Sequence, residues 1–150
     1  MEPSFENLLV HLAKAQVDFL LVGGLAVALN GYPRMTEDVD LWVNPEPDNI
    51  EKLIQALKHY GQGFGGELRT EDFSDEPGAI RINESFSIDL FVQMNGMRYD
   101  EIVQHRSEHE LSSLVIPYVD AEGLIKIKSG SHREKDLLDI SVLKQILKAI

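Results

Sequence analysis

The chain has 150 residues, with 25 acidic against 14 basic side chains and a net charge of -11. This length fits a single domain over residues 1–150, and a composition of 43% hydrophobic and 26% charged residues excludes disordered, collagen-like and coiled-coil chains. Cysteine is absent, which excludes disulfides, thiolate zinc sites and cysteine nucleophiles. Any catalysis must therefore use oxygen and nitrogen groups.

Neither a membrane span nor a secretion signal is indicated by the sequence. No apolar run reaches the roughly 18 residues that a spanning helix needs, and the first residues lack the basic stretch of a signal peptide. We therefore expect a cytoplasmic protein that does not associate with membranes. The acidic average charge also disfavours binding to bare RNA unless a local basic face or a cationic partner assists.

Helices and strands alternate along the first part of the chain. Apolar residues at helical spacing predict a first helix that Ser4 can cap and that ends near Ala15, and the branched apolar run over residues 17–22 predicts a buried strand. A short helix over residues 25–29 and a strand over 39–43 follow. Asp48, with Glu51 three residues later, predicts the capped start of a helix that ends before Gly61.

The second part of the chain begins with a glycine-rich stretch over residues 61–78, which indicates a loop. Strands are predicted over 79–83, 86–92 and 114–119, with a turn at Asn95-Gly96 and a short helix over 99–105. Asp120 should cap the next helix. Ser131 and Glu134 form a capping-box pattern that predicts the start of the final helix.

A glycine pair, Gly23-Gly24, lies where the first strand meets the short helix. Glycines at such a turn let the backbone approach a phosphate closely, and free N–H groups then favour the anion. The alternative is a plain tight turn without a ligand.

Three aspartates are the main candidates for chemistry. Asp38 and Asp40 lie on one face of a strand because side chains alternate, and Asp89 lies in the middle of a later strand. At about 5 Å each carboxylate pair would repel by roughly 3 kcal/mol, and divalent cations would reverse this repulsion. Oxygen-only ligands suit Mg²⁺ or Mn²⁺. The alternative is a solvated strand end, and a lysine or arginine buried among the acids would argue against a metal.

Basic residues near these acids have open interpretations. Arg34 could bind a triphosphate, pair with Glu37 or neutralise the aspartates. The cations Lys126, Lys128, Arg133 and Lys135 gather late in the chain, either to attract nucleotide or RNA or as an ordinary solvated surface. The segment 105–109 spells H-x-x-E-H, a zinc-protease pattern, but its polar surroundings do not predict the amphipathic helix that such a site requires.

The stretch VGGLAVALNGYPRMTEDVDLWV, followed by FSIDLF, resembles the nucleotidyltransferase superfamily that includes DNA polymerase beta, antibiotic nucleotidyltransferases and AbiEii-type toxins. The resemblance rests on Gly23-Gly24, on the Asp38-x-Asp40 pair and on Asp89. The run Arg34-x-Thr36-x-Asp38-x-Asp40 and the later Arg133-x-Lys135-Asp136-x-x-Asp139 are most similar to the AbiEii branch. This chain has Gly24 where many members have a serine that contacts the terminal phosphate.

The resemblance implies an α+β fold with a mixed sheet and helices packed mainly on one face. It also implies transfer of a nucleoside monophosphate from a Mg²⁺- or Mn²⁺-bound nucleoside triphosphate to an acceptor hydroxyl. Asp38, Asp40 and Asp89 would hold metal and carry the catalysis. Gly23, Gly24 and Arg34 would bind the nucleotide, with Lys135 and Asp136 added by their KD motif.

The acceptor could be RNA, a protein or a small molecule, and the chain could form one half of a toxin-antitoxin pair. The alternatives are an antibiotic-type nucleotidyltransferase and a non-catalytic module that binds a partner protein.

Overall fold

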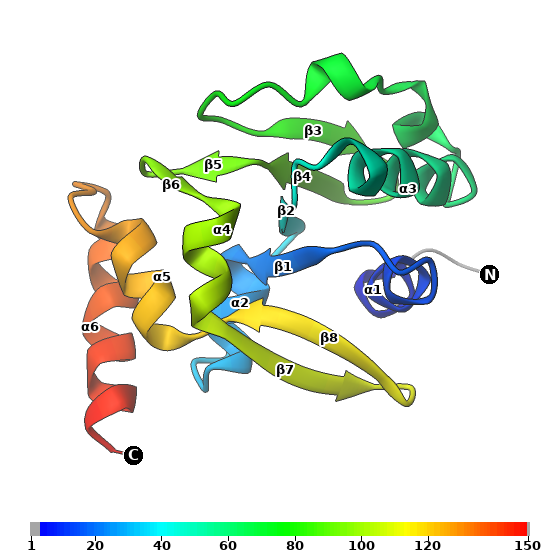
Figure 1. The fold of residues 1–150 in the computed structure, drawn as a ribbon. Coiled ribbons are helices and arrows are strands. Elements are labelled where there is room, and N and C mark those ends of the chain that lie inside the picture. The colour runs from blue at the N-terminus through cyan, green and yellow to red at the C-terminus, as the bar shows by residue number, and fades with distance from the viewer. Residues whose placement is uncertain (1–3, 150) are drawn as a thin grey trace.

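A computed structural model describes residues 4–149, which form a mixed sheet flanked by helices (Figure 1). The helices are α1 (Phe5–Lys14), α2 (Gly23–Leu29), α3 (Pro47–Lys58), α4 (Tyr99–Ile102), α5 (Ala121–Lys128) and α6 (Glu134–Lys148). The strands are β1 (Phe19–Val22), β2 (Asp38–Val43), β3 (Ile80–Asn83), β4 (Ser87–Phe91), β5 (Gln93–Met94), β6 (Met97–Arg98), β7 (Arg106–Leu111) and β8 (Leu114–Val119). Short 3-10 turns cover residues 64–67, 70–72 and 103–105.

Six strands form the main sheet in the order β3-β4-β2-β1-β8-β7. The pairs β2–β4 and β1–β8 are parallel, while β1–β2, β3–β4 and β7–β8 are antiparallel. Strands β5 and β6 form a separate hairpin. The expected mixed sheet is confirmed, and β2 and β4, which carry the candidate aspartates, are direct neighbours in it.

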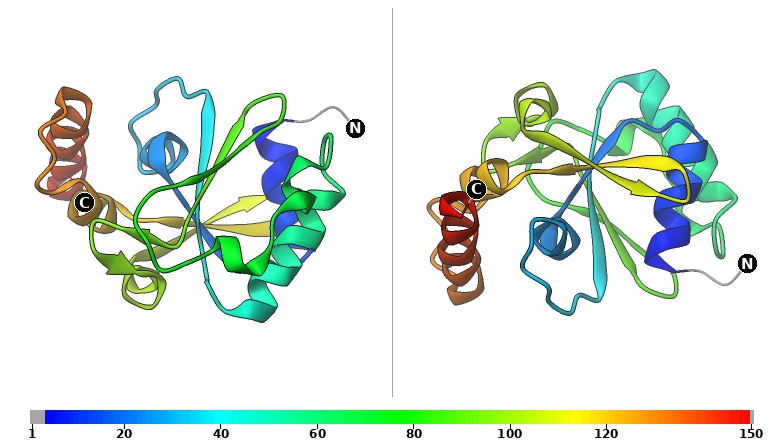
Figure 2. Two further views of the ribbon diagram at one scale, coloured as in Figure 1. Left: turned by 90° about the horizontal axis from the view of Figure 1, so that it is seen from above. Right: turned by 90° about the horizontal axis from the view of Figure 1, so that it is seen from below.

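The two faces of the sheet contribute to two separate hydrophobic clusters. Alternate residues such as Leu21 and Leu41 pack with α1 and α3, whereas Leu20, Val22 and Trp42 pack with α2, α4, α5 and α6. The views from above and below place α1 and α3 on one side of the central strands and α5 and α6 on the other (Figure 2). The fold class is as expected, but helices cover both faces of the sheet rather than mainly one.

Several local expectations hold in the structure and others do not. Ser4 caps α1 and accepts a hydrogen bond from the Asn7 N–H, and Asp120 caps α5 through the Gly123 N–H. The prediction that Asp48 caps α3 is wrong because the helix already begins at Pro47, a residue suited to the first helical turn. Ser131 also does not cap α6, since its hydroxyl instead binds Asp136 and the Arg133 N–H.

The H-x-x-E-H segment belongs to β7 rather than to a helix, with its first histidine in the preceding 3-10 turn. Because the backbone between the two histidines is extended, they are not placed one helical turn apart as this zinc site requires, so the pattern is coincidental here. Within residues 4–149, no helix is long and apolar enough to cross a membrane.

Candidate active site

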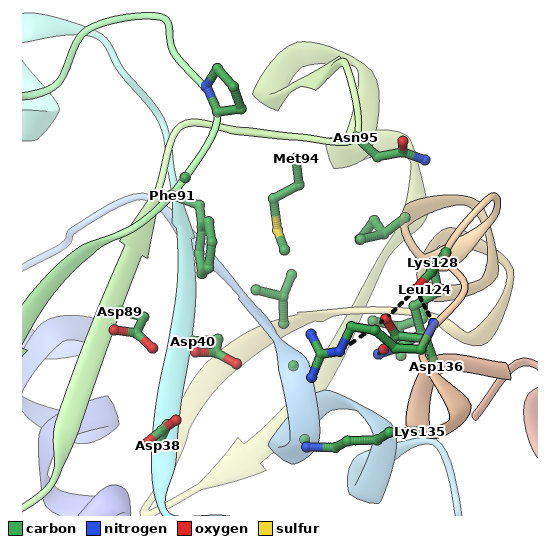
Figure 3. A pocket seen from close by; sticks show the side chains of 18 of the residues that line it. Asp38, Asp40, Asp89, Phe91, Met94, Asn95, Leu124, Lys128, Lys135 and Asp136 are labelled. Carbon is green, nitrogen blue, oxygen red and sulfur yellow. Dashed lines mark hydrogen bonds and ion pairs between the residues drawn. The ribbon is translucent and has the colours of Figure 1, made fainter. Parts of the chain in front are cut away.

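The three aspartates meet on one face of the sheet. In the parallel pair β2–β4, Asp40 lies opposite Asp89, and Asp38 is two residues earlier on the same strand. Residues that are paired in register point to the same face, so all three carboxylates share the face that α2 begins to cover. Figure 3 shows them side by side along one wall of a pocket.

The repulsion within this cluster is seen in the pKa of Asp40. Burial, together with repulsion from Asp89 and Asp38 and a hydrogen bond shared with Asp89, raises the pKa of Asp40 to about 6. Arg81 opposes the shift only in part. The site therefore holds more negative charge than its own residues neutralise, which is the electrostatic condition that attracts a cation.

The raised pKa of Asp40 predicts how the stability of the metal-free protein depends on pH. Because the folded-state pKa lies above the ordinary value of 3.8, this group stabilises the fold below about pH 4 and loses that contribution as the pH rises to about 6. Asp40→Asn does not titrate, so in a chelator its stability should exceed that of the wild type by about 1–2 kcal/mol at pH 8, allowing for solvent screening. The advantage should disappear near pH 4. Denaturant unfolding at both pH values measures it, and an equal difference at the two would contradict the assignment.

Gly23 is required by the position of Asp40. It has a φ of +66°, and a Cβ atom at this position would lie 2.0 Å from Oδ2 of Asp40. Glycine is thus the residue that permits both the left-handed backbone and the close approach of the carboxylate. Gly24 is less constrained, since its Cβ would lie 3.1 Å from the Thr36 side chain and 3.5 Å from Nε of Arg34.

Gly23→Ala should therefore destabilise the protein by about 2 kcal/mol or more, because it combines backbone strain with a clash against Asp40. Gly96→Ala is a matched control for the strain alone: Gly96 has a similar positive φ, +73°, but a Cβ there meets nothing within 4 Å. Thermal unfolding of both variants gives the comparison. Equal losses would mean that the contact with Asp40 adds nothing.

The aspartates form one wall of an open pocket of about 530 Å³, a size typical of small-molecule sites. The pocket is also lined by the apolar side chains of Phe91, Met94, Leu124 and Ile127. Cations line it as well: Arg34, Arg81, Lys128, Arg133 and Lys135. Figure 3 places Lys128, Lys135 and Asp136 across the pocket from the aspartates.

The cations on the α5–α6 side are held by two acids of α6. Nζ of Lys128 lies 3.1 Å from Asp136 and 3.2 Å from Oδ2 of Asp139, the second contact being an ion pair whose direction does not suit a hydrogen bond. Arg34 pairs with the other oxygen of Asp139. Burial alone would raise the pKa of Asp136, but hydrogen bonds from Ser131 and Lys128 outweigh it and lower the pKa.

Among the open interpretations of Arg34, the structure favours pairing, although its partner is Asp139 rather than Glu37. Lys135 is exposed at the pocket wall, and Asp136 binds Lys128. The structure therefore brings all the candidate residues to one pocket, but Asp136 lies there as a partner of a lysine.

Arg81, on β3, is a site residue that the sequence analysis missed. Its Nε lies 2.8 Å from Oδ1 of Asp89, and one terminal nitrogen lies 2.9 Å from Oδ2 of Asp89 and 3.4 Å from Oδ2 of Asp38. The hydrogen bond with Asp89 raises the pKa of this guanidinium. A signal was available, because pairing β3 with β4 through the turn at residues 84–86 places Arg81 directly opposite Asp89.

The three aspartates provide the oxygen ligands that a divalent cation prefers, but their side chains are not arranged around a common metal position. Their all-oxygen donors and the repulsion that raises the pKa of Asp40 suit Mg²⁺ or Mn²⁺. However, within residues 4–149 no group of three or more His, Cys, Asp or Glu side chains is arranged so that it could hold a metal ion. Arg81 is the arginine that would argue against a metal if buried, but 54% of its side chain is exposed.

Comparison with known proteins agrees with this geometry. The sequence model of the nucleotidyl transferase AbiEii toxin family, described as a type IV toxin-antitoxin system, matches residues 7–122. The chain belongs to the AbiEii family. The matched segment includes all three aspartates and Gly23-Gly24, and it ends before α6, so Lys135, Asp136 and Asp139 lie outside it. No curated protein sequence matches the chain.

Solved structures share the nucleotidyltransferase fold of this AbiEii member. The lincosamide antibiotic adenylyltransferase LnuA, solved with lincomycin bound, aligns with a TM-score of 0.65 and 21% identity, covering 93% of this chain and 94% of its own. An antigenic nucleotidyltransferase-like protein from Paracoccidioides brasiliensis aligns with a TM-score of 0.56 and 18% identity over 92% of this chain and 72% of its own. The resemblance recognised from the sequence is thereby confirmed at the level of family and fold.

Proposed function

We propose that this protein transfers a nucleoside monophosphate from a Mg²⁺- or Mn²⁺-bound nucleoside triphosphate to an acceptor hydroxyl and releases pyrophosphate. The observation that carries the proposal is the meeting of Asp38, Asp40 and Asp89 on one wall of a pocket whose other wall is cationic. Acids gather the metal and cations attract the phosphates, so the pocket can hold both parts of a metal–nucleotide complex.

Asp38 and Asp40 are the proposed primary metal ligands, with Asp89 as the third. A divalent cation bound there supplies neutralisation of the charge that develops on the phosphates. In the reaction the acceptor oxygen bonds to the α-phosphorus while the bond from that phosphorus to the bridging oxygen of pyrophosphate breaks. The acceptor proton passes to a carboxylate, for which we propose Asp89, and this role requires Arg81 to release it.

The phosphates are proposed to bind beside the glycine pair and the cationic wall. Arg34 lies against Gly24 while its pairing with Asp139 fixes its direction, so its remaining N–H groups can donate to a phosphate. Lys135 is exposed at the pocket, where its ammonium can reach an anion. Asp136 would act through Lys128, which it holds.

We propose further that the protein serves as the toxin component of a toxin-antitoxin system, paired with an antitoxin partner and acting on RNA or protein. The family description supports this role. A small-molecule acceptor is the second candidate, which the likeness in fold and length to the lincomycin-bound adenylyltransferase favours. A third is a non-catalytic module that binds a partner protein.

An assay with labelled nucleotides separates these candidates. The protein is incubated with Mg²⁺ and each triphosphate labelled at the α-phosphate, in the presence of total RNA, total protein or a lincosamide. Label in RNA or protein supports the toxin reaction, and label in the antibiotic supports the second candidate. Label transfer that survives Asp38→Ala and Asp40→Ala would exclude this site. No label in any acceptor, with growth inhibition that persists in Asp40→Ala, would support the binding module.

A further inference from the structure

The guanidinium of Arg81 already binds the aspartates as a cation would. Both oxygens of Asp89 are bound by one guanidinium, at 2.8 and 2.9 Å, and Asp38 is 3.4 Å from the same group. The Asp89 side chain is 8% exposed. Such a carboxylate needs a positive partner, since an unpaired buried charge is costly.

The same contact prevents Asp89 from joining Asp38 and Asp40 as a ligand. A carboxylate that accepts hydrogen bonds from one guanidinium with both oxygens keeps its remaining lone pairs beside a positive charge, which repels an incoming metal cation. In the described part of the chain, no group of three or more His, Cys, Asp or Glu side chains is arranged so that it could hold a metal ion. The repulsion of Asp40 by Asp89 and Asp38 is relieved by the arginine only in part.

The position of Arg81 allows its guanidinium to move away from Asp89. It lies on β3, one of the two edge strands of the main sheet, and 54% of its side chain is exposed. The residues that precede β3, Pro77 and Gly78, line the open pocket, and a Cβ at Gly78 would meet nothing within 4 Å. Because the Arg81 side chain is half exposed, water can solvate its charge after it leaves, while an incoming cation takes its place beside the buried Asp89.

We propose that Arg81 is an internal substitute for the divalent cation: it neutralises Asp89 in the metal-free protein and must withdraw before Asp89 can bind metal. The inference rests on the proposed function, since it assumes that the aspartates bind a metal. Its consequence is competition, in which the arginine lowers the affinity of the empty pocket for a free ion.

Mn²⁺ binding without nucleotide tests the competition directly. Electron paramagnetic resonance measures free Mn²⁺ during titration of the wild type, Arg81→Gln, Asp40→Asn and the double variant. Arg81→Gln should bind Mn²⁺ at least about fivefold more tightly than the wild type, a typical size for coupling between two sites. The Asp40→Asn substitution should abolish this gain.

Arg98→Gln is the matched control because it also removes one exposed arginine, which pairs with Asp75 outside this pocket. It should bind Mn²⁺ as the wild type does, and circular dichroism confirms that each variant is folded. Equal or weaker Mn²⁺ binding by Arg81→Gln than by the wild type, or an equal gain in Arg98→Gln, would overturn the role of Arg81 alone. If neither the wild type nor Arg81→Gln shows binding that depends on Asp40, both this role and the proposed metal site are overturned.

Discussion

Replacing Asp40 by asparagine is expected to abolish nucleotidyl transfer while leaving the fold intact. The amide keeps the shape of the side chain but removes the charge of the carboxylate that interacts with both Asp38 and Asp89. Loss of metal-supported charge neutralisation removes several kcal/mol of transition-state stabilisation, so the rate should fall by about 1000-fold or more. Rates are measured with α-labelled triphosphate at saturating Mg²⁺, using the acceptor that the assay identifies.

Glu37→Gln is the matched control for Asp40→Asn. It removes one negative charge three residues away, from an exposed side chain that does not line the pocket. We expect this variant to retain activity within about twofold, because exposed charges are strongly screened. Similar losses in the two variants would mean that general acidity, rather than a site built on Asp40, supports the reaction.

Asp139→Asn is expected to cause a large loss of stability. Asp139 is 1% exposed and lies between the cations Arg34 and Lys128, which come from separate parts of the chain. Removing its charge leaves these partly buried cations without their shared partner, at a cost of about 3 kcal/mol. The melting temperature should fall by about 6–12 °C for a chain of this size.

Glu134→Gln, an exposed acid on the same helix, is the control for Asp139→Asn and should change stability by less than about 0.5 kcal/mol. Calorimetric melting at neutral pH compares the two variants. A melting temperature for Asp139→Asn within two degrees or so of the wild type would contradict the view that this acid anchors α6 to the pocket.

The central strands could be predicted because their apolar residues follow a local pattern. Alternation in β2 placed Asp38 and Asp40 on one face, and Asp89 was a candidate because an aspartate in the middle of a later apolar strand is unusual, before the resemblance to nucleotidyltransferases joined the three. Strand β7 was missed for a physical reason: it is an edge strand with little burial on either face, so its polar sequence carries no alternation.

Long-range partners could not be read from local patterns. Arg34 and Asp139 are 105 residues apart in sequence, and only the packing of α6 brings them together. The face that each helix covers is likewise decided by the sheet topology, because helical periodicity reports an apolar stripe but not which side of the sheet receives it. Arg81 is a partner that local sequence could have revealed, since the register of the β3–β4 hairpin alone places it opposite Asp89.

Calorimetric titration with a non-hydrolysable nucleoside triphosphate, with and without Mg²⁺, measures most directly whether the acidic and cationic walls work together. We predict binding that requires Mg²⁺ in the wild type and that is lost in Asp38→Asn and Asp40→Asn. Binding of equal strength in a chelator, or binding that survives both substitutions, would contradict a metal–nucleotide site at the three aspartates.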